Sequence, residues 1–218
     1  MRDFLILKLQ GPMQAWGEHS FEGLRPSGNF PTRSGILGLL GACLGIRRTE
    51  LDRLQRLADS VGIAVRQDER KDRRIVKITD YHTIKDARVE YSGLKSHETI
   101  QTWREYLLDA QFTAAVWNHE GAVVTLETLE EAVKKPFFTP YLGRRSCPLT
   151  RPLFEKRLTT YDPVNALRQI EPCRGTIYSD EGDDNTRRFR VRDVPLIRQP
   201  RQFAGRNIFV YGGDYVPE

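Results

Sequence analysis

The apolar segment nearest the start of the chain places the strongest constraint on the fold. Residues 3–10 (DFLILKLQ) form a dense apolar run that stops at Gly11 and Pro12, which predicts a buried strand ended by a turn. A long loop leads to residues 34–46 (SGILGLLGACLGI), a predicted helix that Thr32 or Ser34 can cap. The chain therefore begins with a strand and then a helix.

The later segments extend this order. An amphipathic segment follows at 49–60 and strand patterns follow at 61–66 and 74–84. Residues 103–117 predict two strands on either side of Asp109-Ala110, and residues 125–135 predict a helix. We interpret 61–66 and 74–84 as a pair of strands. Pro136 closes the helix, and the stretch from Thr139 is predicted on or beside a final strand.

The resulting order, βαββαβ, is typical of a ferredoxin-like (RRM-like) domain, so we expect an α+β fold with this domain over residues 1–154. Residues 85–101 have little apolar periodicity, and a polar insertion of this length predicts a protruding hairpin. After Phe154 the elements become shorter. Residues 155–218 therefore predict a C-terminal extension or small β-rich subdomain.

Arginine is unevenly distributed. The net charge is only +5, but arginine outnumbers lysine by 26 to 8. Residues 23–49 contain four arginines and no acid, and 194–213 is a second basic zone. A guanidinium group suits bidentate phosphate contacts and stacking on bases. The pattern favours a polyanionic partner, although a GC-rich genome would produce the same bias.

The stretch 139-TPYLGRRSCPLTRPLF-154 has three arginines and no acid to pair them. Gly143 would let the backbone approach a phosphate, Arg144 and Arg145 would bind it, and Tyr141 offers a stacking face. An equally open interpretation is a surface loop whose arginines pair with distant carboxylates. In the first loop, Gln14, Trp16 and Arg25 are candidates for binding, but a tryptophan beside Gly17 is as often a core residue.

Three glycines lie on one face of the first predicted helix, at 38, 41 and 45. Each costs roughly 1 kcal/mol relative to alanine in a helix interior, so we expect something to approach that face closely. Close packing on a sheet or another subunit is favoured over direct RNA contact.

The catalytic alternative rests on two histidines. His82 and His97 flank the polar insertion, where they could act as general base and acid in metal-free RNA cleavage, but a lone histidine near a strand end is more often structural or exposed. The three cysteines are far apart and fit neither a disulfide framework nor a zinc site. The sequence contains no Walker loop, no dinucleotide fingerprint, no HExxH and no paired-cysteine metal motif, so we predict no cofactor and no metal.

The first apolar run is too short to span a membrane and contains Lys8. We therefore expect neither a signal peptide nor an anchor, and a cytoplasmic location.

Four blocks, 10-QGPMQAWGE-18, 31-PTRSGILGLLGACLGI-46, 93-GLKSHETIQTWREYL-107 and 139-TPYLGRRSCPLTRPLF-154, resemble the CasD family. This is the RAMP-type subunit of Cascade, the type I-E CRISPR surveillance complex. Beyond residue 154 the similarity is mainly at 200-PRQFAGR-206. The resemblance implies a glycine-rich loop, a thumb hairpin at about 81–103, and a subunit that caps one end of Cascade and holds the 5′ handle of the CRISPR RNA (crRNA).

The resemblance also implies the contacts. The loop 142–148 would lie by the RNA, so that phosphates are the acids of its arginines. The RNA-binding set is then Gln14, Trp16, Arg25, Arg33, Ser34, Tyr141, Gly143, Arg144, Arg145, Ser146, Cys147 and Arg201. The thumb would contact RNA and the CasC backbone subunit through Tyr81, His82, Lys95, His97, Gln101, Trp103 and Arg104.

A further face would contact the large subunit CasA, and target DNA would be met only indirectly. The resemblance implies a non-catalytic subunit, because in Cascade the separate subunit CasE cuts the precursor RNA. We therefore expect no enzymatic activity and no catalytic residues. The alternatives are a metal-free endoribonuclease that processes repeat RNA, and a subunit that contacts only proteins.

Overall fold

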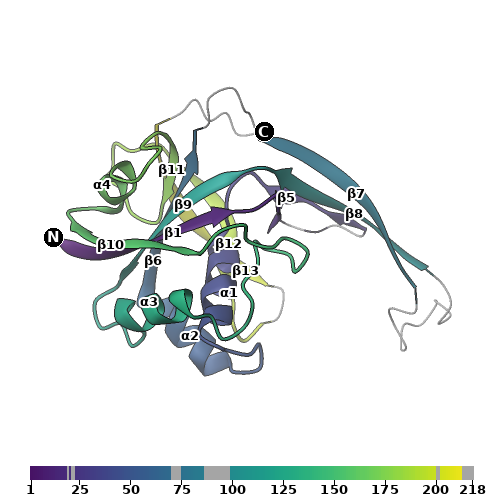
Figure 1. Ribbon diagram of the computed structural model, residues 1–218, viewed down its shortest axis with the longest axis horizontal. Helices are drawn as coiled ribbons and strands as arrows, with labels where there is room; N and C mark the ends of the chain where they lie inside the picture. The colour runs from purple at the N-terminus through teal and green to yellow at the C-terminus, as the bar shows by residue number, and fades with distance from the viewer. Residues whose placement is uncertain (19, 21–22, 70–74, 86–98, 200–201, 213–218) are drawn as a thin grey trace.

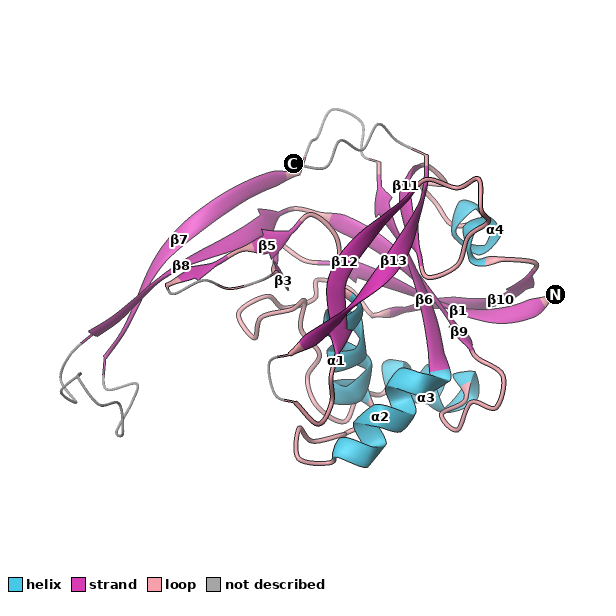
Figure 2. Cartoon of the chain, turned by 180° about the vertical axis from the view of Figure 1, so that it is seen from behind, coloured by secondary structure: helices cyan, strands magenta, loops and turns pink. Residues whose placement is uncertain are grey.

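A seven-stranded antiparallel sheet forms the body of the protein (Figures 1 and 2). The computed structural model describes residues 1–18, 20, 23–69, 75–85, 99–199 and 202–212. Across the sheet the strands are β10 (Phe154–Thr160), β1 (Arg2–Gln10), β9 (Gln111–Asn118), β6 (Val61–Asp68), β11 (Gly175–Ser179), β13 (Phe203–Tyr211) and β12 (Arg188–Pro195). The fold is α+β, as expected, with mostly antiparallel sheets and few helices.

Strand β1 lies inside the sheet, between β10 and β9. Leu5, Leu7 and Leu9 belong to the larger core cluster, whereas Phe4 and Ile6 belong to a second cluster. Because successive side chains of a strand point to opposite faces, β1 contributes to the core on both sides of the sheet. This position explains why its sequence is almost continuously apolar.

Three helices, α1 (Arg33–Cys43), α2 (Leu51–Ser60) and α3 (Leu126–Lys134), supply the larger cluster, and α4 (Pro163–Arg168) supplies the second. Figure 2 shows the two sets on opposite sides of the sheet. The Thr32 hydroxyl caps α1 by accepting from the Gly35 N–H at 3.2 Å, as predicted. The helix ends at Cys43 rather than at residue 46, and Gly45 has a φ of +67°.

The predicted glycine face of this helix is only partly a close-packing surface. A Cβ on Gly38 would meet no atom of the described residues within 4 Å, and one on Gly41 would be 3.7 Å from Leu54. Gly45 lies beyond the helix, where an added Cβ would be 2.7 Å from the Phe137 ring. The expectation of a close approach is therefore wrong for Gly38 within the chain and fits Gly45 alone.

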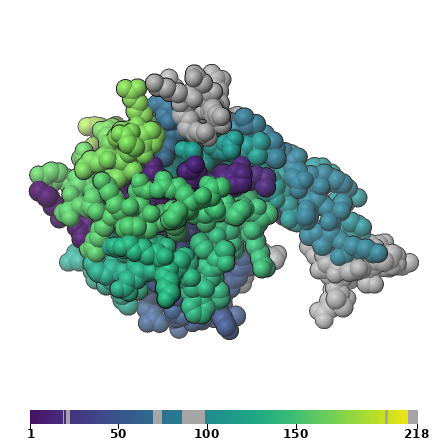
Figure 3. All heavy atoms as spheres, in the orientation of Figure 1, coloured from purple at the N-terminus to yellow at the C-terminus, as the bar shows by residue number. Residues whose placement is uncertain are grey.

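A long antiparallel hairpin leaves the body, and Figure 3 shows it as an arm with a hollow between it and the body. Its strands are β7 (Val76–Lys85) and β8 (Thr99–Leu108), which pair from Val76 with Leu108 to Lys85 with Thr99. The short strands β2 (Met13–Gln14) and β4 (Leu24–Arg25) pair with β8, while β3 (Trp16–Gly17) pairs with β5 (Ser27–Gly28).

Two predicted strand placements need correction. Residues 61–66 lie in β6, and residues 76–84 of the second range lie in β7. The two strands are not a pair, because β6 pairs with β9 and β11 whereas β7 pairs with β8 in another sheet. The final strand before the extension begins at Phe154, not at Thr139. The stretch before it holds only a bridge between Tyr141 and Pro148.

The predicted division into residues 1–154 and 155–218 stays a prediction. Strands from both segments share the seven-stranded sheet, where β11 pairs with β6 and β10 pairs with β1. Within the described residues, no helix is long and apolar enough to cross a membrane.

Candidate nucleic-acid interface

The Gly-Arg-Arg stretch forms a tight loop closed by its own backbone. The Leu142 N–H donates to the Cys147 carbonyl at 2.8 Å, and the Cys147 N–H donates to the Arg144 carbonyl at 2.8 Å. Leu142 and Cys147 are buried, whereas Arg145 and Ser146 between them are exposed. The loop therefore has a buried base and an exposed tip.

Gly143 lets this loop pass very close to the first loop of the chain. Its φ is +84°, and an added Cβ would lie 1.8 Å from the Ala15 carbonyl oxygen. Beside it, the Ala15 N–H donates to the Leu142 carbonyl at 3.1 Å. The sequence interpretation paired this glycine with a phosphate, but in the structure its close neighbour is protein backbone.

The Arg144 guanidinium group is bound to the base of the hairpin. Nη1 donates to the Glu105 carbonyl at 2.8 Å, and Nη2 donates to the Arg25 carbonyl at 2.7 Å. The Tyr106 ring lies against it, with Cζ 4.7 Å from the ring centroid. Arg144 therefore joins three segments of the chain.

Arg145 differs from its neighbour. Its side chain is exposed, and within the described part of the chain it forms no hydrogen bond or ion pair. Ser146 is also exposed, with its hydroxyl 3.5 Å from that of Tyr106, and Tyr141 is half-buried. The loop tip thus presents a cation and a hydroxyl to a ligand.

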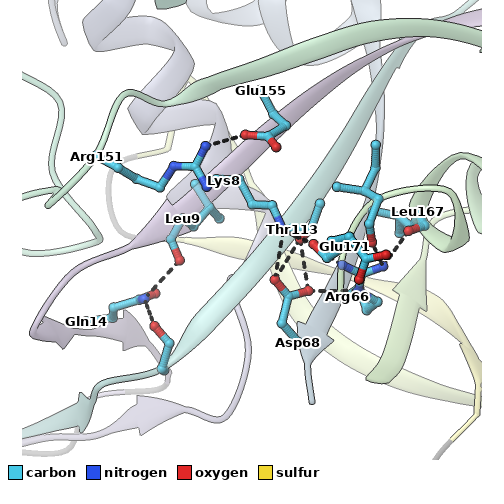
Figure 4. Close-up of polar contacts among 12 residues, drawn as sticks. Lys8, Leu9, Gln14, Arg66, Asp68, Thr113, Arg151, Glu155, Leu167 and Glu171 are labelled. Atoms are coloured by element: carbon cyan, nitrogen blue, oxygen red, sulfur yellow. Dashed lines mark hydrogen bonds and ion pairs between the residues drawn. The ribbon is translucent and has the colours of Figure 1, made fainter. Parts of the chain in front are cut away.

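Direct RNA contact does not fit the positions of Gln14, Trp16 and Cys147, which are fully buried. Gln14 Nε2 donates to the carbonyls of Leu9 at 3.2 Å and Ala110 at 2.6 Å (Figure 4). Its Oε1 accepts from Trp16 Nε1 at 3.0 Å. Burial raises the pKa of the Cys147 thiol, which favours its neutral form. These side chains support the interface from beneath.

Arg33 is also engaged within the protein. Its guanidinium forms an ion pair with Asp180 and donates to the Val61 carbonyl at 2.8 Å, while its backbone N–H donates to Asp193 at 2.7 Å. Arg206 pairs with both of these carboxylates. The network binds the start of α1 to the C-terminal strands, and it is distinct from the Gly-Arg-Arg loop.

Arg25 and Ser34 are partly buried. Arg25 lies on β4, where its Nη1 donates to the Leu24 carbonyl at 3.0 Å. Ser34 lies in the first turn of α1, with its hydroxyl 3.3 Å from that of Thr32. Only Arg25 is brought to the loop, through its carbonyl contact with Arg144.

The hairpin carries an exposed apolar patch. Tyr81 and Trp103 are opposite each other on β7 and β8, with ring centroids 5.5 Å apart, and they are 53% and 44% exposed. Leu24, paired with Trp103 from β4, is 45% exposed. The patch of Leu24, Tyr81 and Trp103 provides stacking faces for bases or an apolar surface for a protein.

The remaining predicted hairpin residues are dispersed. His82 is partly exposed, with its Nδ1 3.8 Å from Asp80, and Arg104 Nε donates to the Thr102 hydroxyl at 3.0 Å. Gln101 is exposed on β8. Lys95, His97 and Arg201 lie outside the described residues.

A buried charged cluster was not anticipated from the sequence. Lys8 Nζ is 3.2 Å from Asp68 and donates to the Thr113 hydroxyl at 2.8 Å, while Arg66 Nε donates to Asp68 at 2.7 Å (Figure 4). These four side chains come from three neighbouring strands, β1, β6 and β9. Lys8 inside an apolar run was the available signal, since a buried charge requires a partner.

Glu105 and Tyr106 were not singled out as site residues either. Strand alternation would place Glu105 on the same face as Trp103, but no spacing rule indicates that Arg144, 39 residues further along the chain, reaches its carbonyl. Contacts of this kind depend on the tertiary fold.

Comparison with solved structures places this fold among CRISPR-associated proteins. A chain of a "CRISPR RNA-guided surveillance complex" is 31% identical, with a TM-score of 0.72 over 95% of this chain and 89% of that one. A "Crystal structure of Cas protein" is 28% identical, with a TM-score of 0.64 over 95% and 93% of the two chains.

The sequence comparisons identify which group of CRISPR-associated proteins the chain resembles. The family model described as "CRISPR-associated protein (Cas_Cas5)" matches residues 4–209. "CRISPR system Cascade subunit CasD" of Escherichia coli (strain K12) is 56% identical over 218 residues, which cover 98% of this chain and 97% of that protein. The chain therefore belongs to the Cas_Cas5 family and, within it, to the CasD family of Cascade subunits.

Proposed function

We propose that this protein is a non-catalytic RNA-binding subunit of a Cascade-type surveillance complex, holding the crRNA 5′ handle and capping one end of the complex in antiviral defence. The homology supports a role in a CRISPR surveillance complex. The observation that carries the finer proposal is the loop tip, where exposed Arg145 stands on a backbone fixed by Ala15 and has no partner in the described chain. A preorganised cation of this kind suits a phosphate.

The finer features of the fold form part of the same proposal. The order β10-β1-β9-β6, with α1 and α3 packed on one face, supports a ferredoxin-like unit, in which such a sheet has its strands in the order 4-1-3-2. The β7–β8 hairpin is then the thumb.

For the partners, we assign the hairpin to the CasC backbone subunit and its RNA, and another face to CasA, with target DNA met only indirectly. The exposed patch of Leu24, Tyr81 and Trp103 supports the first assignment, because aromatic side chains at this exposure serve both protein contacts and base stacking. A cytoplasmic location stays a prediction.

The absence of catalysis is likewise proposed. In the described part of the hairpin, His82 lies beside one carboxylate, that of Asp80, 3.8 Å from its Nδ1. Metal-free RNA cleavage requires both a general base and a general acid positioned on the reacting groups. Incubating the purified protein with precursor repeat RNA without metal tests this point. Specific cutting that His82→Ala or His97→Ala abolished would establish the endoribonuclease alternative instead.

The main test is purification of the tagged protein from its own host, with identification of co-purifying proteins and sequencing of the 5′ ends of bound RNA. We expect a stoichiometric set of subunits and short RNAs that share one repeat-derived 5′ tag. Recovery of the protein without RNA would refute handle binding. Recovery with proteins but no RNA would favour a subunit that contacts only proteins.

Charge reversal then tests the loop. Arg145→Glu places an anion where a phosphate is proposed and should reduce RNA retention in the purified complex. Arg198→Glu, on an exposed side chain paired with Asp52, is the matched control and should retain RNA. Equal retention by both variants would remove Arg145 from the interface.

A further inference from the structure

The two adjacent arginines of the loop are in different states before any ligand binds. Arg144 donates two hydrogen bonds to main-chain carbonyls and stacks on Tyr106, whereas Arg145 projects from the tip. The charge on the two side chains is the same. Their environments indicate different tasks.

The carbonyls that Arg144 binds belong to two adjoining strands. Arg25 ends β4, which has two residues and pairs with β8 in parallel, and Glu105 follows Arg104, the partner of Arg25. Pro26 comes next and has no N–H to continue a ladder. The Arg144 guanidinium group therefore donates to carbonyls at the point where the regular pairing of β4 with β8 stops.

A second side chain holds the same segment. The Glu105 carboxylate accepts from the Ser27 N–H at 3.0 Å and lies 3.7 Å from Lys77 Nζ on β7. Glu105 and Arg144 thus fasten residues 25–27, the loop and the hairpin at one junction. A guanidinium that turned towards a phosphate would leave two partly buried carbonyls without these donors.

We infer that Arg144 is a positioning residue, which braces the Gly-Arg-Arg loop against the base of the β7–β8 hairpin, and that Arg145 makes the phosphate contact. This inference rests on the RNA-binding function proposed above. It makes the loop tip and the hairpin a single preorganised surface. Lysine cannot replace Arg144, because an ammonium group lacks the planar fork and the stacking face.

The test measures binding of the full chain to a fluorescent synthetic single-stranded RNA with the host repeat sequence, over a series of salt concentrations. It is done with the chain alone and with the chain in its co-purified complex after removal of resident RNA. Each arginine is changed to alanine and to lysine. Removing one phosphate contact lowers the slope of log affinity against log salt by about 0.7 for a single strand.

For Arg145→Ala we expect the slope of log affinity against log salt to fall in magnitude by about 0.7. For Arg145→Lys we expect the wild-type slope, because the positive charge is kept. For Arg144 we expect both variants to bind on the order of tenfold more weakly, with the slope unchanged. Amide hydrogen exchange at Ala15, Leu142 and Cys147 should become faster in Arg144→Ala and Arg144→Lys, without RNA present.

The outcomes separate the inference about Arg144 from the RNA-binding function on which it rests. A lower slope for Arg144→Ala, with binding restored by Arg144→Lys, would make Arg144 a phosphate ligand and overturn the inference alone. A lower melting temperature with unchanged RNA affinity in the folded variant would reduce Arg144 to a stabilising role, which also overturns it. No RNA binding by the wild-type chain in either form would refute the proposed function, and the inference with it.

Discussion

At the scale of single residues, the candidate interface depends on side chains that never reach its surface. Gln14 satisfies three polar groups in the core, and Gly143 allows two loops to touch. These residues resemble ligand-binding residues in sequence, because a polar or glycine residue in a loop is compatible with both roles. Burial and backbone geometry distinguish the two.

Gly143→Ala should destabilise the protein more than Gly121→Ala. Both glycines have a positive φ, +84° and +72°, so both variants incur the left-handed backbone penalty of roughly 1–2 kcal/mol. The Gly143 Cβ would also collide with backbone, 1.8 Å from the Ala15 oxygen, whereas at Gly121 no atom of the described part of the chain lies within 4 Å of the added Cβ. Urea unfolding of the two variants measures the difference, and equal losses would contradict this account.

Asp68→Asn should lower the free energy of unfolding by about 3–5 kcal/mol, because it leaves Lys8 and Arg66 buried without a compensating anion. Asp52→Asn breaks the pair with Arg198, whose side chains are 78% and 74% exposed, and should change stability by less than about 1 kcal/mol. Denaturant titrations compare the two. A small loss for Asp68→Asn would mean that the cluster contributes little net stability.

At the scale of elements, sequence patterns predicted individual strands better than their partners. The run at 3–10 and the Thr32 cap are local signals, and both are confirmed. The predicted pairing of residues 74–84 with residues 61–66 was wrong, because segments adjacent in sequence were taken to be adjacent in the sheet. In the structure β7 pairs with β8, which follows the polar insertion. Periodicity reports which face is buried, but not which strand lies alongside.

The same limit applies to the candidate site. The exposed tip with Arg145 follows from a local stretch of glycine and arginine, so it could be anticipated. The attachment of Arg144 to Glu105 and Arg25, and that of Arg33 to Asp180, join segments far apart in the chain. Spacing alone carries no information about such contacts.

The pairing of β1 with β10 should make stability depend on pH through Asp3. Hydrogen bonds from Thr159, directly opposite, and from Arg157 hold the pKa of Asp3 below its ordinary value of 3.8. A lowered folded-state pKa contributes stability above 3.8 that is lost as the pH falls through the folded-state value. Wild type should therefore exceed Asp3→Asn in unfolding free energy at neutral pH.

This advantage should shrink in acid, and unfolding curves at a series of pH values measure it. Thr159→Val removes the largest cause of the shift and should lose part of the same pH dependence. A constant difference between wild type and Asp3→Asn at every pH would show that Asp3 acts through packing rather than through its charge.

At the scale of the whole molecule, the protein combines a well-buried body with a poorly buried arm. Most residues of β1 and β9 are buried, whereas β7 is largely exposed along its length. Few apolar contacts therefore oppose local opening of the hairpin. The body is thus the more rigid part of the protein, and the proposed partner contacts of the arm would be made from it.

Hydrogen exchange should reveal this division. We expect the paired amides of β7 to exchange through local opening, well before those of β1 and β9, which should require global unfolding. Comparing the chain alone with the assembled complex adds a second readout, since a partner bound to the hairpin should slow its exchange selectively. Uniform exchange across arm and body in the free chain would contradict the division.

The strand order also has a consequence for synthesis on the ribosome. The apolar strand β1 is synthesised before its partners β9 and β10, which lie at residues 111–118 and 154–160. At typical translation rates the nascent strand waits on the order of ten seconds for the first of them. During that interval the unpaired, apolar strand β1 can pair with the strands of other chains and aggregate. Expression of this protein should therefore benefit from chaperones that shield β1.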